Sequence, residues 1–184
     1  MPDSLLDPRF VRRVSLLCCH CTRNIAYYRA GFVSEDGTGE LKQQTEFGAT
    51  VNGNMLDIAV LEWCKLFADR RAHHYWKRVV RDEKEQQQFL AHLLRDAGMN
   101  LQGWKRYLDT MRVYRDKFVA HLDTQNVMNI PSLDGALASV QFLYAYLRAT
   151  NPASTFEMLH GEPLPQDLTG YYTRCRDEAR ASYA

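Results

Sequence analysis

The sequence predicts an all-α protein: an antiparallel bundle of four to five helices with a C-terminal extension. Three observations lead to this prediction. Apolar residues recur at steps of three and four over several long stretches, which is the spacing of one buried helix face. No segment alternates apolar and polar residues for long enough to indicate a β-strand. Glycines and prolines mark the ends of several helical stretches, so short connections between neighbouring helices are expected.

The first two helices are expected at residues 10–32 and from about 50–54 to 67. Asp7 or Ser4 suits the N-cap of the first, because a short polar side chain can accept a hydrogen bond from a free backbone N–H. Residues 34–48 are polar and contain three glycines, which predicts a loop. The apolar residues at helical spacing are Phe10, Val14, Leu17, Cys21, Ile25, Tyr28 and Phe32 in the first helix, and Met55, Ile58, Ala59, Trp63, Leu66 and Phe67 in the second.

Two more helices are expected after a second loop at about residues 69–76. One follows Asp82, a suitable N-cap, and stops at Gly98, a typical residue just after a helix end. The next is the central helix, which is expected over about residues 101–121.

The last helix of the bundle is expected to begin near residue 131 and to end at Asn151, which precedes a proline. Residues 1–150 are therefore expected to form one helical domain. Residues 151–184 form a C-terminal tail, in which a short helix is expected from about residue 166 to 182.

Composition excludes several classes of protein. Hydrophobic residues make up 46% and charged residues 24% of the chain, and the formal net charge is +1, so any site for a polyanion has to be a local patch. No run of about 18 apolar residues is present, so no membrane partner is expected. The N-terminus lacks the layout of a signal peptide, and five cysteines do not suggest a disulfide framework. A cytoplasmic, reduced protein is expected.

A zinc site is considered for six residues of the chain: Cys18, Cys19, His20, Cys21, Cys64 and Cys175. Only Cys18 and Cys21 share a helical face within the first cluster, and structural zinc sites usually take a Cys-x-x-Cys pair from a turn. Buried free cysteines that pack as small apolar residues are the favoured interpretation. No metal and no other cofactor is expected.

The stretch 114–123 is the best candidate for a functional centre. Arg115 falls on the apolar stripe of the central helix, where a guanidinium needs a partner or a polar cleft. His121 follows six residues later and can exchange a proton near neutral pH. The alternative is structural: Arg115 pairs with Glu62 or Asp116, and His121 simply ends the helix.

The chain resembles the HEPN superfamily, in which many small helical domains are metal-independent ribonucleases of toxin–antitoxin, abortive-infection and CRISPR systems. Arg115-Asp116…His121 matches the family's Arg-polar…His pattern, although Asn is common where Asp116 stands. Four segments in this order are similar to the abortive-infection AbiU-like branch, over roughly residues 5–150: 24–29, 62–67, 73–76 and 115–123. The resemblance implies an endoribonuclease that acts as a defence or toxin effector. It also implies the catalytic residues Arg115, Asp116 and His121 and a neutralising antitoxin as partner.

Helix geometry also bears on how such a site is assembled. Six residues on one helix turn through about 600°, so Arg115 and His121 point about 120° apart. A two-fold homodimer would bring two arginines and two histidines to a shared groove. HEPN nucleases are known for such dimers, so the resemblance implies the same arrangement. Three aromatic residues on the helix that carries Arg115 further favour an interface there: Trp104, Tyr107 and Tyr114.

Residues 65–81 form the most positive stretch of the chain, with aromatic residues interleaved. Such a stretch is expected to grip a phosphate backbone and stack a base. The alternative is a solvated loop with Trp76 anchored in the core. The candidate RNA-binding residues are Arg70, Arg71, His73, His74, Trp76, Lys77, Arg78 and Lys117.

Two functions other than RNA cleavage remain open from the sequence. One is a non-catalytic HEPN-like module that binds RNA, a nucleotide or a protein, and the other is a structural helical adaptor. The sequence also predicts that Glu62, on the apolar side of its helix, pairs with Arg115 or Arg112 of the central helix, because an unpaired buried carboxylate is costly.

Overall fold

The computed structural model describes residues 6–34, 36–119, 130–157 and 163–183, and it confirms the all-α prediction. Within these ranges the chain forms six α-helices: α1 (Pro8–Ala30), α2 (Glu46–Trp63), α3 (Glu83–Asp96), α4 (Leu101–Tyr114), α5 (Asp134–Thr150) and α6 (Leu168–Ser182). Two π-helical turns, η1 (Cys64–Ala68) and η3 (Arg115–Val119), extend α2 and α4, and η2 (Trp76–Arg78) and η4 (Ala153–Thr155) are short 3₁₀ turns.

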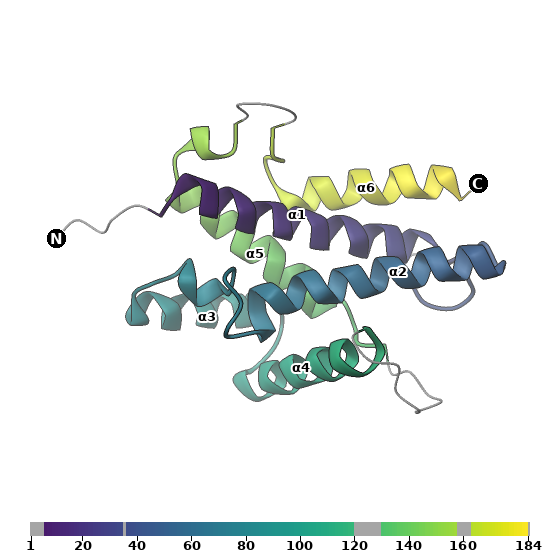
Figure 1. The fold of residues 1–184 in the computed structure, drawn as a ribbon, viewed down its shortest axis with the longest axis horizontal. Coiled ribbons are helices and arrows are strands. Elements are labelled where there is room, and N and C mark those ends of the chain that lie inside the picture. The colour runs from purple at the N-terminus through teal and green to yellow at the C-terminus, as the bar shows by residue number, and fades with distance from the viewer. Residues whose placement is uncertain (1–5, 35, 120–129, 158–162, 184) are drawn as a thin grey trace.

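Helix α1 lies at the centre of the bundle and packs against α2, α5 and α6. In Figure 1 it runs through the middle of the view, with α6 above it and α2 below it. Its first turn is capped by Asp7, whose carboxylate accepts a hydrogen bond from the backbone N–H of Arg9 at 2.9 Å. One side of the helix is closed to solvent over most of its length, through Val11, Val14, Cys18, Cys21 and Ile25.

Helix α2 begins at Glu46, so the predicted start at residues 50–54 is wrong. The hydroxyl of Thr45 accepts a hydrogen bond from the backbone N–H of Gly48 at 3.0 Å, which is an N-cap. Gly48 suggested a loop in the sequence, but here it allows a close approach: a Cβ at this position would lie 2.7 Å from the backbone oxygen of Gln43. The loop before α2 is closed by an isolated β-bridge between Phe32 and Leu41.

A cluster of aromatic rings fixes α4 against α2. Trp63 is fully buried, and its ring centroid lies 5.8 Å from that of Trp104 and 5.3 Å from that of Tyr107. The indole N–H of Trp63 donates to the hydroxyl of Ser139 at 2.8 Å, which ties the cluster to α5. This packing sets the position of the C-terminal end of α4, where Arg115 follows.

The C-terminal tail contributes to the bundle. Helix α6 lies within the range where a short helix is expected, and it packs along α1 with Leu168 and Cys175 buried. In the part of the chain that the structure describes, no helix is both long enough and apolar enough to cross a membrane.

Candidate functional site

Arg115 opens the π-helical turn η3 and lies half-buried, with 24% of its side chain exposed. Its Nε donates to a carboxylate oxygen of Asp116 at 2.8 Å. The hydrogen bond to Asp116 raises the pKa of Arg115, against the opposing effect of burial. Asp116 is 58% exposed, so the pair sits at the edge of the helix packing and is open to solvent on one side. The structure therefore places Asp116 as a partner of Arg115.

Two π-helical turns lie close to each other at this site. η1 packs against α4, and η3 packs against α2, so each turn packs on the helix that leads into the other. The wider i→i+5 hydrogen bond of a π turn changes the angular step along the helix, so the angle of about 120° calculated for a straight α-helix does not apply after Arg115. π turns occur frequently at functional sites. His121, the second predicted catalytic residue, lies outside the described residues.

Cys64, at the start of η1, is a buried thiol near Arg115. Burial raises the pKa of its thiol to about 12, although the charge of Arg115 acts in the opposite direction. The thiol lies 3.9 Å from the backbone oxygen of Met111, toward which it can donate. A thiol with so high a pKa remains protonated near neutral pH and is not a nucleophile. Cys64 therefore serves as a small apolar group of the buried core.

Among the described residues Glu62 pairs with neither Arg115 nor Arg112, so both predicted partners are wrong. The side chain is largely buried, with 13% exposed, and its ion pair is with Lys65 of η1 at 3.9 Å. Arg112 is engaged elsewhere: its Nε and one terminal nitrogen donate to the backbone oxygen of Ala68 at 3.1 and 2.8 Å. Arg112 thus closes the end of η1, and it also pairs with Asp109 at 3.1 Å.

The aromatic residues of α4 are used inside the monomer. Trp104 and Tyr114 are buried, and the hydroxyl of Tyr114 donates to Asp57 at 2.8 Å. The hydroxyl of Tyr107 donates to the backbone oxygen of Ser132 at 2.7 Å. These rings therefore no longer support a dimer interface on this helix, and the argument from an excess of aromatic residues is wrong.

The most positive stretch, residues 65–81, is called the basic loop from here on, and its first part lies near Arg115. Asp69 is close enough to Arg115 to contribute to its raised pKa, and Arg70 and Arg71 follow on the exposed side. Lys117 lies two residues beyond Arg115 on η3 and is half-buried. The described part of the site thus brings Arg115 to one end of the most positive stretch of the chain.

Trp76 does not offer a free ring, so the prediction that it stacks a base is wrong. Its side chain is 5% exposed and stacks on Phe89, with ring centroids 4.9 Å apart and planes 16° apart. The ammonium of Lys77 lies over the Trp76 ring at 5.5 Å. Trp76 anchors the loop in the core, which was the alternative interpretation of this residue.

The first helix supplies residues to the basic loop that the sequence did not indicate. Phe10 packs edge-on against His73 at 5.3 Å and stacks on His74 at 6.2 Å. Burial lowers the pKa of His74, and His73, Arg13 and Lys65 lower it further. Phe10 and Arg13 lie about 60 residues from the histidines in the sequence, and only the packing of α1 brings them there.

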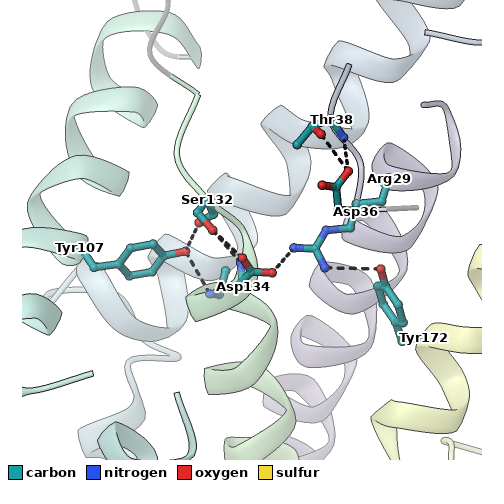
Figure 2. Close-up of polar contacts among 8 residues, drawn as sticks. Arg29, Asp36, Thr38, Tyr107, Ser132, Asp134 and Tyr172 are labelled. Atoms are coloured by element: carbon teal, nitrogen blue, oxygen red, sulfur yellow. Dashed lines mark hydrogen bonds and ion pairs between the residues drawn. The ribbon is translucent and has the colours of Figure 1, made fainter. Parts of the chain in front are cut away.

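A second polar network lies at the other end of α1 (Figure 2). Arg29 donates to Asp134 at 2.6 Å and to the hydroxyl of Tyr172 at 3.5 Å, so it joins α1 to α5 and α6. Hydrogen bonds from Ser132 and Arg29 lower the pKa of Asp134, although burial opposes them. Tyr107 of α4 reaches the same turn through Ser132. A pocket of about 670 Å³ opens beside this network.

The network in Figure 2 explains the role of Arg29, the charged residue that ends the segment 24–29. With 13% of its side chain exposed, Arg29 is held by two partners on different helices, as expected for a side chain that fixes their relative positions. The five cysteines are free thiols buried in the bundle. No group of three or more potential metal ligands occurs among the described residues.

Comparison of the chain with protein families, curated proteins and solved structures finds no match.

Proposed function

We propose that the protein is a HEPN-type, metal-independent endoribonuclease in which Arg115 stabilises the phosphate and His121 acts as general acid and base. The observation that carries the proposal is the position of Arg115, half-buried beside the solvent-exposed Asp116, on a π turn at the edge of the basic loop. Asp116 binds the Nε of Arg115, and this holds the planar guanidinium in one orientation. The terminal nitrogens can then make a two-point contact with phosphate oxygens.

The chemistry follows from these two residue types. The 2′-hydroxyl of RNA attacks the adjacent phosphorus, and the bond from phosphorus to the 5′-oxygen breaks. One histidine takes the proton of the 2′-hydroxyl, and a proton is returned to the 5′-oxygen as it leaves. Arg115 offsets the negative charge that grows on the non-bridging oxygens. The products are a 2′,3′-cyclic phosphate and a 5′-hydroxyl.

We propose a two-fold dimer as the active form, because two subunits supply two arginines and two histidines to one groove. Exposed apolar side chains near Arg115 support an interface there. Val113 of α4 is 50% exposed and Ile58 of α2 is 40% exposed. Their neighbours Tyr114 and Asp57 are hydrogen bonded to each other, so the two side chains lie on adjoining helices of one region. A role as a cytoplasmic defence or toxin effector, with an antitoxin as partner, is part of the proposal.

The test is a ribonuclease assay on purified protein with EDTA present. Wild type is expected to cut RNA and not DNA of the same sequence. His121→Ala is expected to lose about 10²-fold or more in rate, the usual scale for a general base. Arg115→Lys is expected to be damaged despite its charge, because the fork that spans two oxygens is gone. Arg106→Ala, on the exposed side of the same helix, is the matched control and should keep full activity.

A non-catalytic RNA-binding module is the second candidate, and one observation favours it. Asp116 neutralises part of the charge of Arg115, whereas the positive side chains around Phe10, His73 and His74 form a separate basic surface. A wild-type protein that binds RNA in the assay but leaves it uncut, at every metal concentration, would establish this function in place of cleavage.

A further inference from the structure

A concave basic pocket lies between the start of α1 and the segment from His73 to Arg81. Its volume is about 530 Å³, which is within the usual range for sites that hold one small ligand. The residues that line it are Asp7, Phe10, His73, Lys77, Arg78 and Arg81. Residues far apart in the sequence thus line one open hollow, and Arg115 is not among them.

The pocket concentrates positive charge in a chain that is nearly neutral. Among the described residues that line the pocket, Lys77, Arg78 and Arg81 carry three positive charges and Asp7 carries one negative charge, whereas the whole chain carries a formal +1. The carboxylate of Asp7 already accepts the hydrogen bond that caps α1. This charge favours a ligand with more than one negative charge.

Several of these side chains are held in place before any ligand binds. The Nε of Arg78 donates to the backbone oxygen of Ala72 at 3.0 Å. Lys77 lies over the ring of Trp76, which is itself fixed against Phe89. The rings of Phe10 and His73, which pack edge-on at 5.3 Å, line the pocket together. Side chains that are already ordered lose less conformational entropy on binding.

We propose that this pocket binds a nucleotide phosphomonoester, either at the end of an RNA chain or on a free nucleoside monophosphate. A phosphomonoester carries a charge of about −1.5 to −2 near neutral pH, more than the single charge of each phosphodiester in the backbone. A concave site lined by several positive side chains suits this doubly charged end group better than it suits an extended strand, in which each phosphate carries a single charge. The rings of Phe10 and His73 provide a surface for the nucleoside. The choice of a nucleotide rests on the proposed action on RNA.

The test compares end groups on one RNA sequence. Fluorescence anisotropy is measured with a 2′-O-methyl RNA of about 12 nucleotides, within the range of single-strand site sizes. It carries a 5′-phosphate, a 3′-phosphate or hydroxyls at both ends. The 2′-O-methyl groups prevent cleavage through the 2′-oxygen. One phosphorylated form is expected to bind about tenfold more tightly than the hydroxyl form, the scale of a charge-assisted hydrogen bond.

Matched variants locate the effect. The double variant Lys77→Gln/Arg78→Gln is expected to lose the preference for the phosphorylated end. Lys105→Gln/Arg106→Gln removes the same charge from exposed positions of α4 outside the pocket and is expected to keep the preference. Equal binding of all three RNAs, or equal loss in both double variants, would overturn the assignment.

Competition separates the two sources of the phosphate. Displacement of the RNA by AMP at a similar affinity identifies a free nucleotide as a ligand, whereas preference for the RNA end identifies a polynucleotide, and either result supports the pocket. Tighter binding of a phosphoserine peptide than of either would contradict a nucleotide site. Arg115→Ala is expected to keep the end preference, so a failure of RNA cleavage is distinguishable from a failure of this pocket.

Discussion

Replacing Asp116 by Asn tests how this carboxylate acts on Arg115. The Nε of Arg115 is bound to Asp116 at 2.8 Å, and Asp116 is 58% exposed. An RNA phosphate has to compete with this carboxylate for the guanidinium. We therefore expect Asp116→Asn to bind RNA more tightly and to cut it faster than wild type.

The size of the effect follows from the exposure of the pair. Solvent-exposed ion pairs stabilise a protein by about 0.2–1 kcal/mol. The Arg115–Asp116 pair lies at the surface of the bundle, so its interaction energy is expected in this range. Release of that interaction strengthens phosphate binding by about 1.4- to 5-fold, since about 1.4 kcal/mol corresponds to tenfold. The gain is expected to shrink as salt is added, because screening weakens exposed charge pairs.

The assay is RNA binding by anisotropy and cleavage by gel, each over a series of salt concentrations. Asp109→Asn is the matched control, because Asp109 is 71% exposed, lies on the same helix and pairs with Arg112 at 3.1 Å. It removes the same charge without touching Arg115. Asp116→Asn that binds no more tightly than Asp109→Asn, or that cuts RNA more slowly than wild type, would refute this role and would favour a role for Asp116 in positioning His121.

Two further predictions concern stability. Ser139→Ala leaves the indole N–H of the buried Trp63 without its acceptor, so the free energy of unfolding should fall by about 1–3 kcal/mol in urea denaturation. The control Ser182→Ala, at an exposed helix end, should change the free energy of unfolding by less than about 0.5 kcal/mol. Equal effects of the two variants would contradict the role of the hydrogen bond from Trp63. The pKa of His74 is lowered in the folded protein by burial and by His73, Arg13 and Lys65, so the unfolded chain binds the proton more tightly. Stability should therefore decline as the pH falls below about 6.5, and His74→Gln should reduce this decline while His92→Gln, on the exposed face of α3, should not.

The sequence predicted the helices whose limits depend on local chemistry. The apolar stripe from Phe10 gives α1, and Asp82 caps α3 by accepting from the backbone N–H of Glu85 at 2.9 Å. The start of α2 was missed because Gly48 has two roles: it favours loops in general, but here it supplies the N–H that Thr45 binds. The two π turns were missed because a single wide turn leaves the three- and four-residue spacing of apolar residues almost unchanged.

The site was less predictable because its contacts come from tertiary packing. Arg115 was found because a charged residue on an apolar stripe stands out, but nothing in the sequence shows that Arg112 would close η1 instead of pairing with Glu62. The position of Trp76 in the core depends on Phe89, and the approach of Phe10 to His73 depends on the direction of α1. Such pairings are not encoded in periodicity.

The central claim is tested most directly by the end groups of the RNA products. Purified protein is incubated in EDTA with an RNA and with the same RNA carrying one 2′-deoxy nucleotide at the cleavage site, and the products are identified by mass spectrometry. Attack by the 2′-hydroxyl predicts a 2′,3′-cyclic phosphate and a 5′-hydroxyl from the first RNA, and no cleavage at the substituted position of the second. Cleavage at the 2′-deoxy position, or a 5′-phosphate on the product, would contradict the mechanism in which Arg115 and His121 act on RNA without a metal.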